Sequence, residues 1–300
     1  MPPAPTSAQT RGALAVGVCY LLWGIVPIYW KQLVGIQPLE LIAHRQIWSL
    51  VFIAVLVVAQ GAFGEVWAVL RQPRALAFNI LCSVLLTLNW LVYVEGVAAG
   101  HVIECSLGYF LVPLVNVAAG RLVFKEQLRP LQWIAIACAT GGVAWMLLQL
   151  DRPPWIAFSL TLTWGAYSLL KKKSTLGPLT GMTVETLVAA PLAIAYLLWR
   201  HHEGTGALGH VDAWTQTLIL SAGIITAIPL LLFAYGAQRI RLSTLGLIQY
   251  ITPTMQFILA VWLYHEPFSR DRAVSFAFIW VGLALYTGDS LLAQRNRAAV

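Results

Sequence analysis

One stretch of the chain occurs twice, and this duplication decides the fold. GVAAGHVIECSLGYFLVPLVNVAAGRLVFKEQLRP (Gly96–Pro130) aligns without a gap with GAQRIRLSTLGLIQYITPTMQFILAVWLYHEPFSR (Gly236–Arg270), 140 residues later. Identical residues are few, but the proline and the glutamate are 13 residues apart in both copies. The matched positions are Gly96 and Gly236, Pro113 and Pro253, Glu126 and Glu266, and Gly142 and Gly282. The chain is therefore an internal repeat.

The same offset extends towards the N-terminus. Arg45 aligns with Glu185, and Trp23 aligns with Trp164 after a shift of one further residue. The repeat unit is thus half of the protein, and we predict two domains, residues 1–150 and residues 151–300.

The composition is that of an integral membrane protein. Hydrophobic residues make up 59% of the chain and charged residues 10%, whereas soluble domains carry about 25% charged residues. Apolar runs of membrane-spanning length recur throughout. We predict ten spans, at residues 12–30, 39–60, 75–95, 102–123, 131–150, 154–171, 178–199, 214–235, 241–264 and 272–292.

The distribution of Lys and Arg predicts the topology. With the N-terminus in the cytoplasm, 13 of the 19 basic residues lie in cytoplasmic segments, five lie outside, and Arg45 lies within a span. Cytoplasmic loops of membrane proteins are enriched in this way. The net charge of +7 therefore indicates topology and not a nucleic-acid partner, and both termini are expected in the cytoplasm.

Five spans in each half have a direct consequence. Because five is odd, the second half must cross the bilayer in the opposite direction to the first. Inverted repeats of this kind are common in secondary transporters, whose substrate sites lie near the midplane between the halves. We therefore predict an all-α membrane protein with two inverted five-helix repeats.

Five motifs carry a resemblance to a known family. They are LLWGIVPIYWK (Leu21–Lys31), LELIAHRQIWS (Leu39–Ser49), SLGYFLVPLVN (Ser106–Asn116), RLSTLGLIQYITPT (Arg241–Thr254) and FAFIWVGLALY (Phe276–Tyr286). They resemble RarD proteins, which belong to the EamA group of the drug/metabolite transporter superfamily. The resemblance implies ten helices, two EamA repeats, a bacterial inner-membrane location and export of small molecules. RarD proteins are often labelled chloramphenicol-resistance permeases, whereas relatives of the YddG type export amino acids and other metabolites.

Aromatic and amide side chains within the spans are the candidate substrate-binding residues. They are Trp23, Asn89, Tyr93, Tyr109, Trp164, Tyr167, Gln249 and Tyr250. Asn89 and Tyr93 share a helix face because they are four residues apart. Each residue alone is explained as well by packing, but the set suits a cavity for small amphipathic ligands.

Ionisable residues and prolines within spans are the candidates for gating or coupling. Buried charges in a bilayer are costly and need a partner or a function. Arg45 is either a clamp between helices or a gate or substrate-carboxylate ligand, and Glu104 and Glu185 are either structural or proton-coupling groups. Pro113 and Pro253 occupy equivalent repeat positions and are expected to bend their helices.

The sequence lacks the motifs of the main alternative classes. It contains no HExxH, G-x-S-x-G or P-loop pattern, which argues against an enzyme, a metal site and ATP-driven transport. The sequence also lacks a Gly-rich filter typical of a channel. The expected function is export of small metabolites, most of all amino acids, by alternating access without a cofactor. The expected partners are the substrate, the lipid bilayer and protons as coupling ion; a drug-efflux permease is the alternative.

Overall fold

The computed structural model describes residues 7–148, 153–265 and 270–298, and the described residues form helices without any strand. The elements are α1 (Ser7–Ile25), α2 (Pro27–Lys31), α3 (Pro38–Ala59), α4 (Phe63–Arg71), α5 (Pro73–Ala98), α6 (Val102–Val123), α7 (Pro130–Leu147), α8 (Trp155–Lys173), α9 (Pro178–His202), α10 (Ala213–Ala237), α11 (Leu242–Gln249), α12 (Ile251–Ile258), the π-helix η1 (Leu259–Leu263) and α13 (Arg270–Ala298). The all-helical fold class is confirmed.

Every predicted span coincides with a helix or with consecutive helices, and only the short α4 was not expected. Within the described residues, eight helical segments are long and apolar enough to cross a membrane. The helix α8 ends in three lysines and is not among them, and the apolar part of α13, Ala273–Asp289, is shorter. The count of ten spans therefore stays a prediction.

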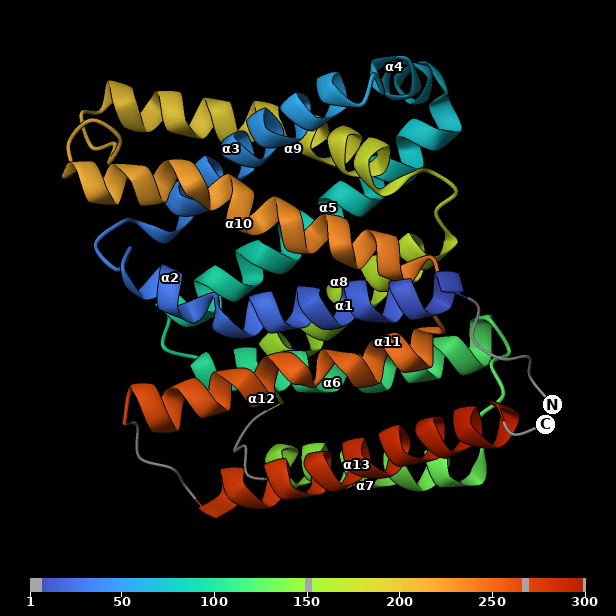
Figure 1. Cartoon of the computed structure of the whole chain (residues 1–300). Helices are drawn as coiled ribbons and strands as arrows, with labels where there is room; N and C mark the ends of the chain where they lie inside the picture. Colours follow the sequence, from blue (N-terminus) through green and yellow to red (C-terminus); the bar gives the residue numbers. More distant parts are fainter. Residues whose placement is uncertain (1–6, 149–152, 266–269, 299–300) are drawn as a thin grey trace.

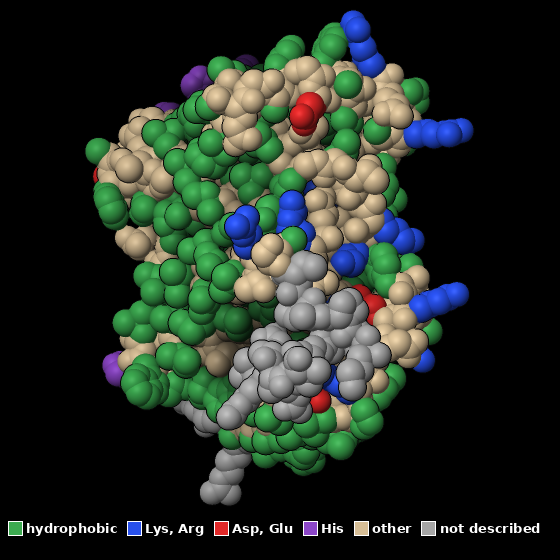
Figure 2. Space-filling view, turned by 45° about the vertical axis from the view of Figure 1, so that its right-hand side comes forward, with side chains coloured by type: hydrophobic (Ala, Val, Ile, Leu, Met, Phe, Trp, Pro, Cys, Tyr) green, Lys and Arg blue, Asp and Glu red, His purple; other side chains and the backbone are tan. Residues whose placement is uncertain are grey.

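The helices run side by side, and α1 begins at the same end of the bundle at which α13 finishes (Figure 1). We call this the termini end and the opposite one the far end. Figure 2 shows an extensive apolar surface. Most of the Lys and Arg side chains visible in this view lie on its right, where the termini end is turned towards the viewer. An apolar surface of this kind is suited to lipid.

The packing of the two halves follows the internal repeat. The first helix of the first half, α1, packs against α10, α11 and α12 of the second half. Its equivalent, α8, packs against α5 and α6 of the first half. The last helices of the halves, α7 and α13, pack against each other. Each half thus contributes its first helix to the other one, and the cavities between helices are built from both halves.

The matched glycines Gly142 and Gly282 explain one of these contacts. A Cβ atom on Gly142 would lie 2.7 Å from the carbonyl oxygen of Ser275, and one on Gly282 would lie 2.6 Å from that of Ala135. Ser275 and Ala135 are themselves repeat equivalents. The crossing of α7 and α13 is therefore two-fold symmetric, and only glycine permits so close an approach at both positions.

Prolines interrupt two of the segments. Pro253 provides no N–H for the carbonyl of Gln249, and α11 gives way to α12 at this point. Pro27 likewise begins α2, and the Trp23 carbonyl, which lacks its helical donor, accepts from Nε2 of Gln256 at 3.5 Å. Pro113, the repeat equivalent of Pro253, instead lies inside the uninterrupted α6. The helix assignment is thus interrupted beside only one of the two matched prolines.

Contacts between distant segments close the termini end. The carboxylate of Glu126, in the loop after α6, accepts hydrogen bonds from the backbone N–H of Leu242 and Ser243, the first residues of α11, at 2.7 and 3.1 Å. The Ser243 hydroxyl donates to it at 2.6 Å. A Cβ atom on Gly12 of α1 would approach Cβ of Arg239 to 2.7 Å. Little space therefore remains between the helices here.

Candidate functional site: an aromatic chamber between the halves

A cavity of about 490 Å³ lies between helices of both halves. We call it the aromatic chamber. Its deepest wall residues, among them Trp164 and Gln249, lie near the middle of their segments, and Trp30, Val102 and Val261 lie at the far end. The remaining lining residues are Tyr20, Trp23, Val26, Pro27, Trp90, Tyr93, Ser106, Tyr109, Phe110, Met146, Thr252, Pro253, Gln256, Phe257, Ala260 and Phe276. The chamber thus extends from mid-bundle towards the far end.

Aromatic rings in contact form two walls of the chamber. Trp23 and Trp164 meet edge to face with their centroids 5.3 Å apart, which joins α1 to α8. Tyr93 and Tyr109 meet at 5.6 Å and join α5 to α6. Edge-to-face pairs are worth about 0.5–1.5 kcal/mol beyond their buried area. The rings therefore hold one another in place and present a rigid apolar surface to a ligand.

Gln249 is the polar group at the deep end of the chamber. Its side-chain oxygen accepts from the Tyr20 hydroxyl at 3.2 Å and from Nδ2 of Asn116 at 3.4 Å. These bonds fix the orientation of the amide, whose nitrogen has no hydrogen-bond partner among the described residues. A ligand in the chamber would thus meet the oriented Gln249 amide among mostly apolar walls.

Five of the eight predicted substrate-binding residues line this chamber: Trp23, Tyr93, Tyr109, Trp164 and Gln249. Asn89 lies behind the wall, where it donates to the Leu160 carbonyl and accepts from the Tyr109 hydroxyl at 3.2 Å. Tyr167 and Tyr250 are also outside the lining: Tyr167 bonds to Glu185, and Tyr250 donates to the Phe110 carbonyl.

Several lining residues are not among the predicted site residues, although the helical spacing of the sequence indicates them. Tyr20 precedes Trp23 by three residues, and Ser106 precedes Tyr109 by three. Thr252 and Gln256 follow Gln249 at three and seven residues. Residues three, four or seven apart share a helix face. If each predicted face is extended by one or two turns, it includes these four residues.

Arg45 lies in a second cavity of about 310 Å³, which we call the side cavity, between α3, α5, α9 and α10. Its guanidinium lies over the Trp90 ring, 3.7 Å from the centroid. Trp90 lines both cavities and so separates them. No carboxylate of the described residues forms an ion pair with Arg45, which is 6% exposed.

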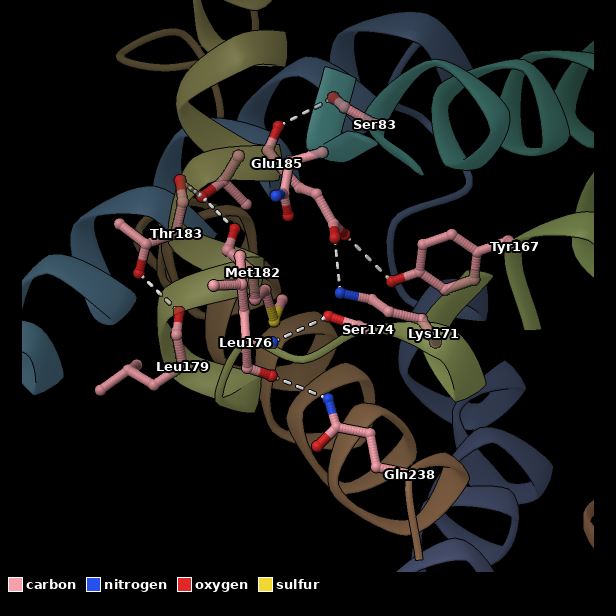
Figure 3. A network of polar contacts seen from close by, with 12 residues as sticks. Ser83, Tyr167, Lys171, Ser174, Leu176, Leu179, Met182, Thr183, Glu185 and Gln238 are labelled. Atoms are coloured by element: carbon pink, nitrogen blue, oxygen red, sulfur yellow. Dashed lines mark hydrogen bonds and ion pairs between the residues drawn. The ribbon is translucent and has the colours of Figure 1, made fainter. Parts of the chain in front are cut away.

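Glu185 is held in a buried network that Figure 3 shows from close by. Nζ of Lys171 lies 2.5 Å from one carboxylate oxygen, and the Tyr167 hydroxyl donates to the other at 3.1 Å. The Ser83 hydroxyl donates to the backbone carbonyl of Glu185 at 2.8 Å. Lys171 is the first of the three lysines that end α8, yet it is only 3% exposed. Removal of either partner of this ion pair by mutation would leave the other as an uncompensated buried charge.

The other gating candidates occupy different positions. Glu104 is buried near the far end, in the first turn of α6. Pro253 lines the chamber at the break between α11 and α12. The carbonyl oxygen of Pro113 lies 2.7 Å from the position that a Cβ of Gly246 would take, where α6 crosses α11. Within the described residues, no three His, Cys, Asp or Glu side chains gather in a group that could hold a metal ion.

Comparison with known proteins agrees with this architecture. The family model of the EamA-like transporters matches residues 10–148 and again residues 154–288. An uncharacterized transporter of Vibrio cholerae is 39% identical over 94% of each chain. The protein RarD of Escherichia coli is 38% identical over 96% of this chain and 98% of its own. A solved crystal structure with 21% sequence identity superposes with a TM-score of 0.73, covering 96% of this chain and 99% of that one, and has the same fold.

The resemblance seen in the motifs is therefore confirmed over nearly the whole length. The chain forms a bundle of two equivalent halves with cavities between them. Its relatives are named as transporters. The protein belongs to the EamA-like transporter family of the drug/metabolite transporter superfamily and is a multi-pass bacterial membrane transporter.

Proposed function

We propose that the protein is a secondary transporter that exports small metabolites, amino acids above all, across the bacterial inner membrane by alternating access. Both termini lie in the cytoplasm in this proposal. The observation that supports it most is the aromatic chamber, which lies between the halves and extends from mid-bundle towards the far end, while Glu126 binds the start of α11 at the termini end. Such a cavity, accessible from one side, is what alternating access requires.

In this proposal the structure is the outward-facing state. The inward-facing state would require α11 to move away from α6, and therefore loss of the Glu126 hydrogen bonds at the start of α11. Because the halves are repeat equivalents, each half would take up in the second state the conformation that the other half has in the first. Glu266, the equivalent of Glu126, lies outside the described residues.

The gating and coupling roles remain proposals of the same kind. Pro253 marks a break at the chamber wall, a natural place for a hinge, and Pro113 would take this role in the second state. Glu104 and Glu185 are the carboxylates through which protons could drive export. Arg45 would control passage between the chamber and the side cavity through Trp90.

A drug permease is the competing function, and the chemistry of the chamber gives it some support. The walls are mostly aromatic, and Gln249 is an uncharged donor at the deep end. Such a site also suits a neutral aromatic compound. A relative from Pseudomonas aeruginosa, 29% identical over 96% of this chain and 97% of its own, is named chloramphenicol-sensitive protein RarD. Chloramphenicol is therefore the drug to test.

Counterflow in liposomes tests the proposal. Purified protein is reconstituted with an unlabelled amino acid inside, and uptake of the labelled amino acid is measured across the common amino acids. Trp23→Ala should reduce uptake about tenfold, as expected if the bound substrate loses one aromatic contact worth about 1.5 kcal/mol. Trp133→Ala is the matched control, because Trp133 is 50% exposed on α7 and does not line the chamber. Equal uptake by both variants would exclude the chamber as the site.

Resistance of cells separates the two functions. Cells that overproduce the protein should tolerate toxic amino-acid analogues better than cells that overproduce the Trp23→Ala variant. Unchanged tolerance of the analogues together with raised tolerance of chloramphenicol would favour the drug permease. Rapid ion currents instead of saturable counterflow would indicate a channel.

A further inference from the structure

The side cavity contains a buried cation without a counter-ion. Arg45 extends from α3 into this cavity and is 6% exposed. None of the described residues accepts a hydrogen bond from its guanidinium, and no described carboxylate lies within 4 Å of its nitrogens. A buried arginine is normally paired with an acid or with backbone carbonyls, so that this one lacks a partner of opposite charge.

Two acids that could be expected to pair with Arg45 are already engaged. Glu185 lines the same cavity, but its two carboxylate oxygens bind Lys171 and Tyr167. Glu40, five residues before Arg45 on α3, binds Arg200 at 3.1 Å and the backbone N–H of Ala207 at 2.5 Å. Glu185 is therefore neutralised by Lys171, and the side cavity keeps the positive charge of Arg45.

Other donors in the cavity are also unpartnered. Oγ1 of Thr226 and Nε1 of Trp90 are buried, and neither has a hydrogen-bond partner among the described residues. Both residues line the side cavity together with Arg45. A guanidinium presents its N–H groups in a planar fork that matches the two oxygens of a carboxylate. The cavity thus combines a cation with unused neutral donors.

We infer that the side cavity is a binding site for the carboxylate group of a small organic acid, with Arg45 as its principal ligand and Thr226 as a second donor. Trp90 fixes the position of the guanidinium from one side. The site is distinct from the aromatic chamber, with which it shares only the Trp90 wall. The inference concerns binding and is independent of the proposed transport function.

Binding of propionate to the purified protein in nanodiscs of neutral lipid tests this inference by isothermal titration calorimetry. Propionamide is the matched uncharged probe, because it has the same shape without the charge. Propionate should bind and propionamide should not. Arg45→Gln should weaken the affinity about a hundredfold, as expected for loss of one partner of a buried charge pair. Arg45→Lys should weaken it about tenfold, because a lysine cannot form the planar fork.

Arg71→Gln is the control, since Arg71 also lies over a tryptophan ring, that of Trp67, but is exposed on α4. It should bind propionate like the unaltered protein. Thr226→Val keeps the size and removes the hydroxyl, and should weaken binding several-fold. This variant keeps the inference testable if Arg45→Gln does not fold.

A carboxylate could reach the side cavity from water or from the membrane, because Leu192 in its lining is 74% exposed on α9. A second titration therefore uses nanodiscs that contain oleate. If native mass spectrometry shows oleate retained on the protein and propionate does not displace it, the natural ligand is a membrane-borne acid. If propionate binds or displaces the oleate, the natural ligand is a soluble acid. Either result supports the inference. The inference is overturned if propionamide binds as tightly as propionate, if neither propionate nor oleate binds, or if their binding is unchanged in Arg45→Gln. None of these results would affect the counterflow result.

Discussion

The hydrogen bonds of Glu126 give the sharpest prediction about how the termini end stays closed. The first residue before α11, Arg241, provides no side-chain cap. Glu126, from the loop between α6 and α7, takes this role through the backbone N–H of Leu242 and Ser243 and the hydroxyl of Ser243. The perturbation is Glu126→Ala, which leaves these donors without an acceptor.

The magnitude follows from the contacts. Loss of a helix N-cap costs about 0.5–2 kcal/mol, and a negative charge at a helix N-terminus contributes about 0.3–1 kcal/mol. Because the carboxylate is partly buried and accepts three hydrogen bonds, we take a value of about 2 kcal/mol. Since about 1.4 kcal/mol corresponds to a factor of ten, opening of this contact should become about 30-fold more frequent.

Hydrogen–deuterium exchange measures this opening directly. The amides of Leu242 and Ser243 should exchange about 30-fold faster in Glu126→Ala, while those of α3 should keep their rate. Ser243→Ala removes only the hydroxyl contact and should have a smaller effect. Glu65→Ala is the control, because Glu65 accepts from the Thr180 hydroxyl and makes no contact with α11. Exchange that changes by less than twofold in Glu126→Ala would refute the argument.

Two further predictions concern packing and charge. Gly282→Ala should lower the free energy of unfolding by about 1–3 kcal/mol through overlap with the Ala135 carbonyl, whereas Gly17→Ala, which meets nothing within 4 Å, should not destabilise the protein; thermal unfolding in detergent measures both. Glu185→Gln should cost about 3–5 kcal/mol because it leaves Lys171 buried and unpaired, and the double variant with Lys171→Met should recover most of this loss. If the double variant still exports substrate along a proton gradient in liposomes, Glu185 is not the coupling group.

The sequence was sufficient for the class of protein and for its symmetry. Hydropathy identifies membrane helices because each apolar segment must satisfy its own backbone hydrogen bonds in lipid, wherever its neighbours lie. The repeat was legible because equivalent positions meet equivalent constraints. Gly142 and Gly282 show this best, since each approaches a carbonyl of the opposite helix across the same crossing.

Tertiary structure decided which side chains reach a cavity. Asn89 and Tyr93 share a helix face, yet only Tyr93 lines the chamber, because α8 covers Asn89 and binds its amide. Lys171 lies in a basic run typical of a loop, but its rotation about α8 points it to Glu185. Sequence spacing fixes the face on which a residue lies, whereas contacts between distant helices fix the direction in which that face points. The side cavity around Arg45 arises for this reason from four helices, none of which shows it alone.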